Sequence, residues 1–207
     1  GALKGTHRPE TDESPGNGLP VYADDRTLLG IQKRFDYIFK PTQIGGGKPK
    51  LRLVNASRFS GNDPLRIGAV RAIPIPMFHG DLQTTGWLLS VEGVDSVRSI
   101  AYLTDCSRIP ESSIETLVAY GGIIEHAVID GLREKPHATH FSYFQAMESA
   151  ALIGLRRTWL THMSHNMSHN DITRYCVRRT EDLPVLSEIV KEGGSVLPAY
   201  DGLALDV

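Results

Sequence analysis

The hydrophobic positions along the chain change their period about half-way through the sequence. Four extended apolar runs, separated by Gly, Asn and Asp, predict strands over residues 51–59, 67–78, 85–91 and 97–105. From Pro110 onward, helical and extended periods alternate. Helices are expected over about 110–119 and 140–155, with Ser142 as an N-cap, and strands over 123–130 and 156–162. A β-rich half followed by helix–strand alternation predicts an α/β (α+β) fold with helices packed on a layered sheet.

The two ends of the chain extend this pattern. Residues 1–18 have no apolar period and are rich in Gly, Pro, Thr and charge, which predicts a flexible leader or a cut end. A strand over 19–23 and a helix from Asp25 to Phe39 follow, and a last helix and strand close the chain. We therefore expect one domain over residues 19–207.

Composition and charge narrow the class of protein. The formal net charge of −2 gives no basic footprint of the kind that nucleic-acid binders carry, so nucleic acid is not the favoured partner. The two cysteines, Cys106 and Cys176, are too few for a disulfide framework or a thiolate metal site. No apolar run approaches the ~20 residues of a membrane span, and no signal peptide is visible, so a cytoplasmic location is expected.

Histidines at strand ends are the most informative feature of the sequence. Seven of the eight histidines lie between His79 and His169. His79, Asp105 and His162 each end an extended run, while His137 and His140 link a strand to a helix. Imidazole and carboxylate groups at one edge of a rigid sheet are what a hydrolytic metal site needs, and such ligands suit Zn²⁺, Mn²⁺ or Fe.

Simpler interpretations exist for each of these residues. A single strand-end histidine is often a surface residue, and Asp105 alone suits a turn. The spacing of His162, His165 and His169 fits one exposed face of a helix. His126, inside the strand over 123–130, fits a satisfied core residue. Three separate strand ends with the same chemistry favour a metal site over these alternatives taken together.

The order of short motifs also resembles a known family. HG, TGW, YLTDCSRIPESS, PHATHFS and LTHMSHNMSH follow one another as in the second half of metallo-β-lactamase-fold hydrolases. The resemblance is to the PhnP-like phosphodiesterases and extends over residues 19–207. It implies an αββα sandwich, of which this chain contains the C-terminal two-thirds.

The resemblance implies a role for each motif residue. His79 matches a histidine that ligates one metal ion, Asp105 the carboxylate that bridges two ions, and His162 the ligand of the second ion. His140 matches a histidine that contacts the scissile phosphate or protonates the leaving oxygen, and His137 is the weaker candidate for that role. His165 either contacts the metal ligands without binding an ion, or it is itself the ligand of the second ion in place of His162. The implied cofactors are two divalent ions, Zn or Mn.

One family motif is missing from the sequence. The family's H-x-H-x-D-H motif supplies about half of the metal ligands, and this chain contains no His-x-His. We expect the chain to begin just after that motif. The missing N-terminal part is then an expected partner, and the isolated chain is expected to be inactive. A natural protein without the motif is the alternative.

The resemblance implies a metal-dependent hydrolase that attacks a small or cyclic phosphodiester with a hydroxide held by two metal ions. A tRNA 3′-processing nuclease of the same fold is an alternative, although no basic arm is visible. A lactonase or thioesterase is a weaker variant, and a non-catalytic fragment belongs to another class.

Overall fold

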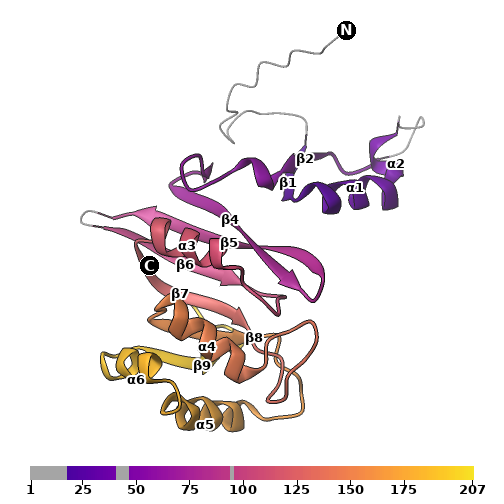
Figure 1. Cartoon of the computed structure of the whole chain (residues 1–207). Helices are drawn as coiled ribbons and strands as arrows, with labels where there is room; N and C mark the ends of the chain where they lie inside the picture. Colours follow the sequence, from indigo (N-terminus) through magenta and orange to yellow (C-terminus); the bar gives the residue numbers. More distant parts are fainter. Residues whose placement is uncertain (1–17, 41–46, 94–95) are drawn as a thin grey trace. The chain divides into compact units, whose positions relative to one another are not determined.

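A computed structural model describes residues 18–40, 47–93 and 96–207 of the chain (Figure 1). They form two compact units, residues 1–68 and 69–207, which are considered separately. The predicted leader, apart from Gly18, lies outside the described residues. A single domain over 19–207 stays a prediction.

The first unit pairs two short parallel strands, β1 (Leu19–Ala23) and β2 (Leu51–Asn55). Between them lie α1 (Asp25–Arg34) and α2 (Asp36–Phe39). Asp24 caps α1 by accepting a hydrogen bond from the Thr27 amide. The expected single helix is interrupted because Phe35 leaves helical geometry, with φ −118° and ψ 38°. A 3₁₀ turn (Ala56–Arg58) and β3 (Leu65–Ile67) complete this unit.

The second unit contains six strands of one mixed sheet, in the order β4-β5-β6-β7-β8-β9. β4 (Val70–His79), β5 (Leu82–Glu92) and β6 (Val97–Leu103) are antiparallel neighbours. β7 (Ile123–Asp130), β8 (Arg157–Thr161) and β9 (Ser195–Pro198) continue the sheet in parallel with β6. β7 confirms the strand predicted over 123–130, and its ends are the predicted ones.

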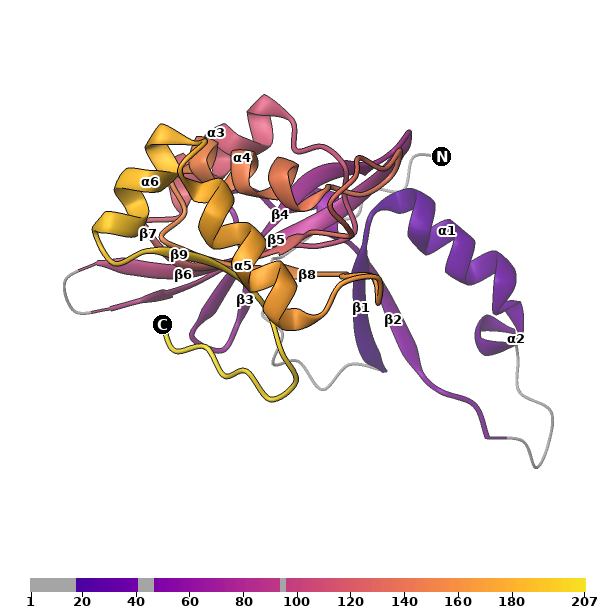
Figure 2. The same cartoon turned by 90° about the horizontal axis from the view of Figure 1, so that it is seen from below.

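Four helices cover one side of this sheet (Figure 2). They are α3 (Glu111–Tyr120), α4 (Tyr143–Ile153), α5 (His169–Thr180) and α6 (Pro184–Lys191). Alternate strand residues point into the core beneath them and are fully buried, among them Ile75, Met77, Leu88, Ala101, Leu103, Ala127, Ile129 and Leu160. This arrangement confirms the predicted layering of helices on a sheet.

Ser142 caps α4 as the sequence predicts. Its hydroxyl accepts from the Gln145 amide, and the Gln145 side chain accepts from the Ser142 amide, which makes a reciprocal capping box. Gly154 ends the helix in the left-handed region at φ 76°, where a side chain would be strained. The helix begins at Tyr143 rather than His140, because the cap is at Ser142.

The single helical face suggested for three histidines is wrong. His162 directly follows β8, His165 lies in a turn, and His169 is the first residue of α5. The helix starts late because Ser168 caps it through the Asp171 amide. Among the described residues, no helix has the length and apolar character needed to cross a bilayer.

Candidate metal centre

The strand directions of the second unit bring four strand ends to one edge of the sheet. β6, β7 and β8 are parallel, so their carboxyl ends coincide. β4 and β6 are both antiparallel to β5, so β4 runs in the same direction as β6 and also ends at this edge. His79, Asp105, Asp130 and His162 lie at or just after these four ends.

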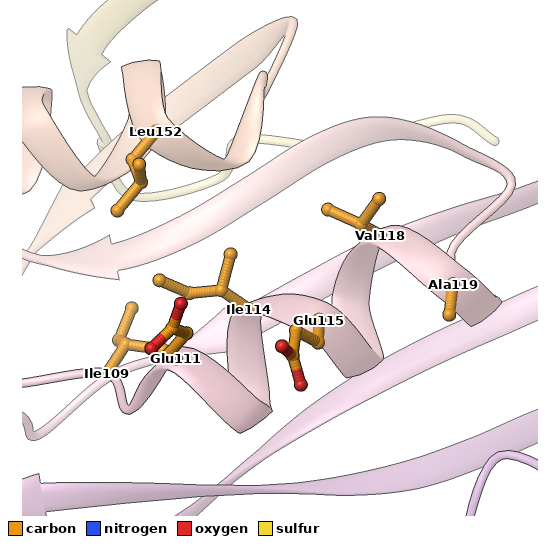
Figure 3. A pocket seen from close by; sticks show the side chains of 7 residues that line it. All are labelled: Ile109, Glu111, Ile114, Glu115, Val118, Ala119 and Leu152. Carbon is orange, nitrogen blue, oxygen red and sulfur yellow. The ribbon is translucent and has the colours of Figure 1, made fainter.

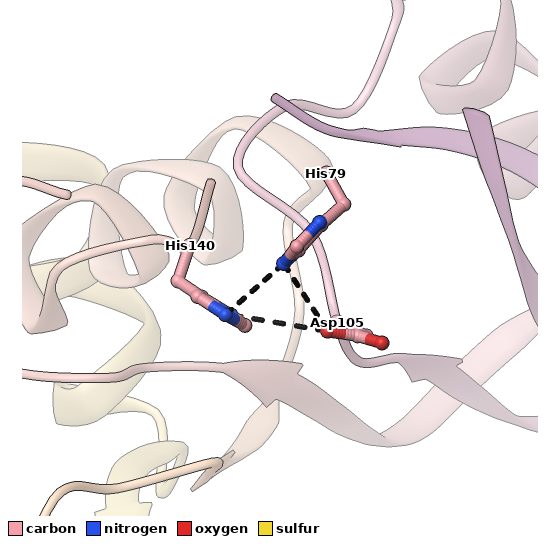
Figure 4. A group of neighbouring side chains, drawn as sticks. All are labelled: His79, Asp105 and His140. Atoms are coloured by element: carbon pink, nitrogen blue, oxygen red, sulfur yellow. Dashed lines mark hydrogen bonds and ion pairs between the residues drawn. The ribbon is translucent and has the colours of Figure 1, made fainter. Parts of the chain in front are cut away.

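Three of these side chains and His140 point toward a common centre. His79 Nε2 lies 3.6 Å and His162 Nε2 lies 3.8 Å from Asp105 Oδ1. His140 reaches the centre from the loop before α4, with its Nε2 3.1 Å from His79 Nε2 (Figure 4). The tightest group is His79, Asp105 and His140, whose ligand atoms all lie within 4.8 Å of one another.

Asp130 orients the His140 ring from its buried side. Its side chain is 0% exposed, and its Oδ2 lies 2.7 Å from His140 Nδ1 and accepts the Cys106 amide at 2.9 Å. Burial raises the pKa of Asp130, while the contacts with His140 and the Cys106 amide act in the opposite direction. When Asp130 is ionised, it holds the proton of the neutral imidazole on Nδ1, so that the lone pair of Nε2 faces the centre.

Two residues of the group have an unusual backbone. Asp105 (φ 61°) and His162 (φ 60°) are the two non-glycine residues with positive φ in the described part of the chain. Each left-handed residue costs on the order of 1 kcal/mol, so the surrounding structure must enforce it. Strain of this kind occurs preferentially where a side chain must be aimed, here at the shared centre.

Backbone hydrogen bonds tie the four loops together. The Ser107 amide donates to Phe78 O, the Phe141 amide donates to Cys106 O, and the Gly131 amide donates to Thr161 O. The Ser164 amide in turn donates to Leu132 O. Each loop that carries a candidate residue is therefore fixed by its neighbour, and the group is held in place before anything binds.

Gly80 allows the close approach of two of these loops. It has φ 61°, and a Cβ there would lie 3.0 Å from the Thr139 side chain. Its amide donates to Ser107 Oγ at 2.9 Å. A side chain at this position would be strained in the backbone and would push the loop of His140 away from His79.

The donor set fits a divalent transition metal. Imidazole nitrogens and a carboxylate oxygen are the ligands of hydrolytic Zn²⁺ and Mn²⁺ sites. The His79 and His140 Nε2 atoms at 3.1 Å must share a proton or face one cation, since two lone pairs at that distance repel each other. Asp130 Oδ1, which is buried, has no hydrogen-bond partner among the described residues.

The remaining predicted residues lie outside this group. The His137 ring is 5.4 Å from that of His140, and its Nδ1 lies 3.3 Å from the Thr139 amide nitrogen, which fits a bond within its own loop. His165 is exposed, and the structure gives it no contact with Asp105, whereas His162 also stacks on His140 with ring centres 5.4 Å apart. Of the two alternatives for the third ligand, the geometry favours His162.

Sequence reasoning missed Asp130. The residue ends the apolar run of β7 and precedes Gly131, so it carries the same strand-end signal as Asp105. That signal was available, but nothing in the sequence alone showed that the carboxylate would point at His140.

Residues 6–163 match the family described as the beta-lactamase superfamily domain. The chain belongs to this superfamily. Its mixed sheet and helical layer are those of the metallo-β-lactamase fold. The fold implied by the motif resemblance is thereby confirmed, and superfamily membership implies divalent metal ions.

Solved structures of this superfamily align with most of the chain. A diphosphatase from the PhnP family is 26% identical, with a TM-score of 0.65 over 93% of this chain and 60% of that one. YhfI from Bacillus subtilis is 17% identical, with a TM-score of 0.57 over 90% of this chain and 63% of that one. Yeast PDE1 is 14% identical and has a TM-score of 0.57, over 92% of this chain and 60% of that one. The resemblance to PhnP-like hydrolases is confirmed.

A curated relative shares one segment with the chain. An octanoyltransferase from Porphyromonas gingivalis is 28% identical over 149 residues, 72% of this chain but 27% of that protein. The name therefore describes a much longer protein. The chain likewise spans about 60% of the length of the PhnP-family diphosphatase.

Proposed function

We propose that this superfamily hydrolase cleaves a small or cyclic phosphodiester with two divalent ions, Zn or Mn. The convergence of His79, Asp105, His140 and His162 on one centre is the observation that carries the proposal. The 26% identity to a PhnP-family diphosphatase across 93% of the chain supports phosphorus chemistry.

Three residues would hold the ions. His79 would bind one ion, His162 the other, and Asp105, whose Oδ1 lies within 4 Å of both imidazoles, would bridge them. When bound, the ions supply Lewis acidity and an activated water to a phosphodiester. Few other ligands face this centre among the described residues, so we expect the isolated chain to bind metal weakly and to be inactive by itself.

His140 would act on the leaving group. Its side chain is 15% exposed, and Asp130 fixes its ring from the buried side. When its Nε2 is also protonated, an imidazole held in this way could donate that proton or a hydrogen bond to the departing alkoxide. The amides of the first turn of α4, which follows His140, add a weaker attraction for phosphate oxygens.

Two other activities remain rivals within the same superfamily. A nuclease of the tRNA 3′-processing type would need to bind a polyanion, and the formal net charge of −2 does not favour it. Ester or thioester hydrolysis needs no anionic substrate. A panel of bis(p-nitrophenyl) phosphate, a cyclic dinucleotide, structured RNA and an octanoyl thioester separates these classes.

The role of His140 is tested by His140→Ala in the longest natural form of the chain that can be purified. We expect turnover of the phosphodiester to fall by about 10²- to 10⁴-fold, because a proton donor is lost. Manganese affinity, measured by titration calorimetry, should change little. His165→Ala is the matched control and should leave both quantities unchanged.

The opposite pattern would identify a different role. If His140→Ala removes metal binding along with turnover, His140 is a ligand, as its 3.1 Å distance from His79 also permits. If the unsubstituted protein binds metal and cleaves the thioester but no phosphodiester, the proposed substrate class is wrong.

A further inference from the structure

A shallow hollow of about 640 Å³ lies between α3 and α4 in the second unit, away from the metal centre (Figure 3). Its apolar lining comes from Ile109, Ile114, Val118 and Leu152, and its polar lining from Glu111 and Glu115. α3 contributes Glu111, Ile114, Glu115, Val118 and Ala119, and α4 contributes Leu152, so two separate elements build one surface.

Two of the apolar side chains are unusually exposed. Val118 is 64% and Leu152 is 70% exposed, although both lie on helices that bury their other face in the core. Single exposed apolar residues are common, but these two flank one hollow whose floor includes the partly buried Ile114. Together with Ile109, Ile114 and Ala119, they give the hollow an apolar lining that a partner could cover.

Acidic side chains flank the same surface. Glu111 and Glu115 are one turn apart on α3, and Glu148 is one turn before Leu152 on α4. All three are exposed, and none forms an ion pair with a residue that the structure describes. No Lys or Arg among the described residues lines the hollow, so the glutamates make this surface locally acidic.

Both helices present these residues in the same order. α3 and α4 each connect neighbouring parallel strands, so the two helices run in the same direction. Glu115 precedes Val118 by three residues on α3, and Glu148 precedes Leu152 by four residues on α4. Each helix therefore presents an acidic side chain about one turn before an exposed apolar one.

We propose that this acidic, apolar hollow is a docking site for a basic amphipathic helix of another protein. An apolar face with residues one turn apart would cover Val118 and Leu152, and flanking Lys or Arg would pair with the glutamates. A second copy of the chain, related by a two-fold axis through the hollow, would place glutamates against glutamates, and this repulsion disfavours it.

The test uses a fluorescein-labelled synthetic helix of Leu and Lys, about 18 residues long so that it is helical when bound, and a twin with Glu in place of Lys. Fluorescence anisotropy with the full chain should show saturable binding of the Lys peptide alone, weakened by added salt. The double variant Val118→Ser, Leu152→Ser should weaken binding by about tenfold or more. Val177→Ser is the matched control, because Val177 on α5 is also 64% exposed.

Charge is tested separately by Glu111→Gln with Glu115→Gln, which should lower affinity and reduce its dependence on salt. Circular dichroism establishes that each variant is folded. Equal binding of both peptides, or equal loss with Val177→Ser and with the double variant, would overturn the proposal. Concentration-dependent dimerisation that the double variant abolishes would instead assign the surface to a second copy.

Discussion

Two histidines of the second unit illustrate how the same side chain serves two purposes. His126, within β7, is 5% exposed and uses both ring nitrogens: Nδ1 accepts from Trp159 Nε1 at 3.1 Å, and Nε2 lies 3.2 Å from the Asp206 carbonyl. His140 also has a partner at Nδ1, the buried Asp130. Its Nε2, however, faces His79 Nε2 and lies beside Asp105.

The difference lies in the partners. Neutral groups satisfy both nitrogens of His126, so that histidine is complete as a packing residue, which confirms the sequence prediction. A carboxylate at one nitrogen and an imidazole at the other leave His140 ready to accept a cation or to give up a proton. The chemical kind of the partner at each nitrogen, rather than the number of partners, thus distinguishes His126 from His140.

The largest effect is expected from Asp105→Ala. This change removes the carboxylate that lies between His79 and His162, and the two imidazoles alone hold a divalent ion poorly. In the longest natural form of the protein that can be purified, affinity for Mn²⁺ or Zn²⁺ should fall by more than the roughly 10- to 100-fold that loss of an outer partner of a metal ligand costs, as measured by titration calorimetry. Asp201→Ala, at an exposed turn, should bind as the unsubstituted chain does. Unchanged affinity in Asp105→Ala would remove Asp105 from the site.

Asp130→Asn should have the next largest effect. Both contacts end at Asp130 Oδ2, and an asparagine oxygen there would accept them without the negative charge, so it would hold the His140 proton less firmly. The His140 ring should then lose its fixed tautomer, and turnover should fall by about 10- to 100-fold, less than for His140→Ala. The nitrogen chemical shifts of the His140 ring provide a readout that does not depend on activity. An unchanged ring spectrum would contradict the orienting role.

His126→Phe should affect stability and spare the metal centre. It leaves the Trp159 indole N–H and the Asp206 carbonyl without their present partner. The free energy of unfolding should fall by about 1–2 kcal/mol, measured by urea denaturation. Metal affinity should stay within about twofold, since a change that touches no ligand seldom alters binding further. A large loss of metal binding in this variant would contradict the division between the two histidines.

The smallest effect concerns the two thiols, which are free and buried. Burial raises the pKa of Cys176 from 9.0 to about 12 and raises that of Cys106 further. Neither thiol should react with Ellman's reagent at pH 8 in the native protein, whereas both should react after unfolding. Above pH 9.0 the unfolded thiols ionise before the folded ones, so stability should decrease as pH rises. Labelling of the native protein at pH 8 would contradict this burial.

The sequence by itself determined most of the elements and much of the chemistry. A short, largely apolar run predicted β7, Ser142 was predicted as the N-cap of α4, and imidazoles at successive strand ends indicated a metal site. These signals are local, because each depends on backbone period, capping or residue type within a few positions. The α5 helix was missed since its polar, charged sequence has little apolar content to mark it.

Only the tertiary structure decided which of these residues meet. The parallel direction of β4, β6, β7 and β8 places four strand ends at one edge, and no local pattern encodes that pairing. It also placed His162 rather than His165 beside Asp105, brought Asp130 against His140, and kept His126 apart from this group. Asp105 lies 26 residues and His162 lies 83 residues after His79 in the sequence. These side chains meet only because of the strand order and register of the sheet, which the whole core fixes together.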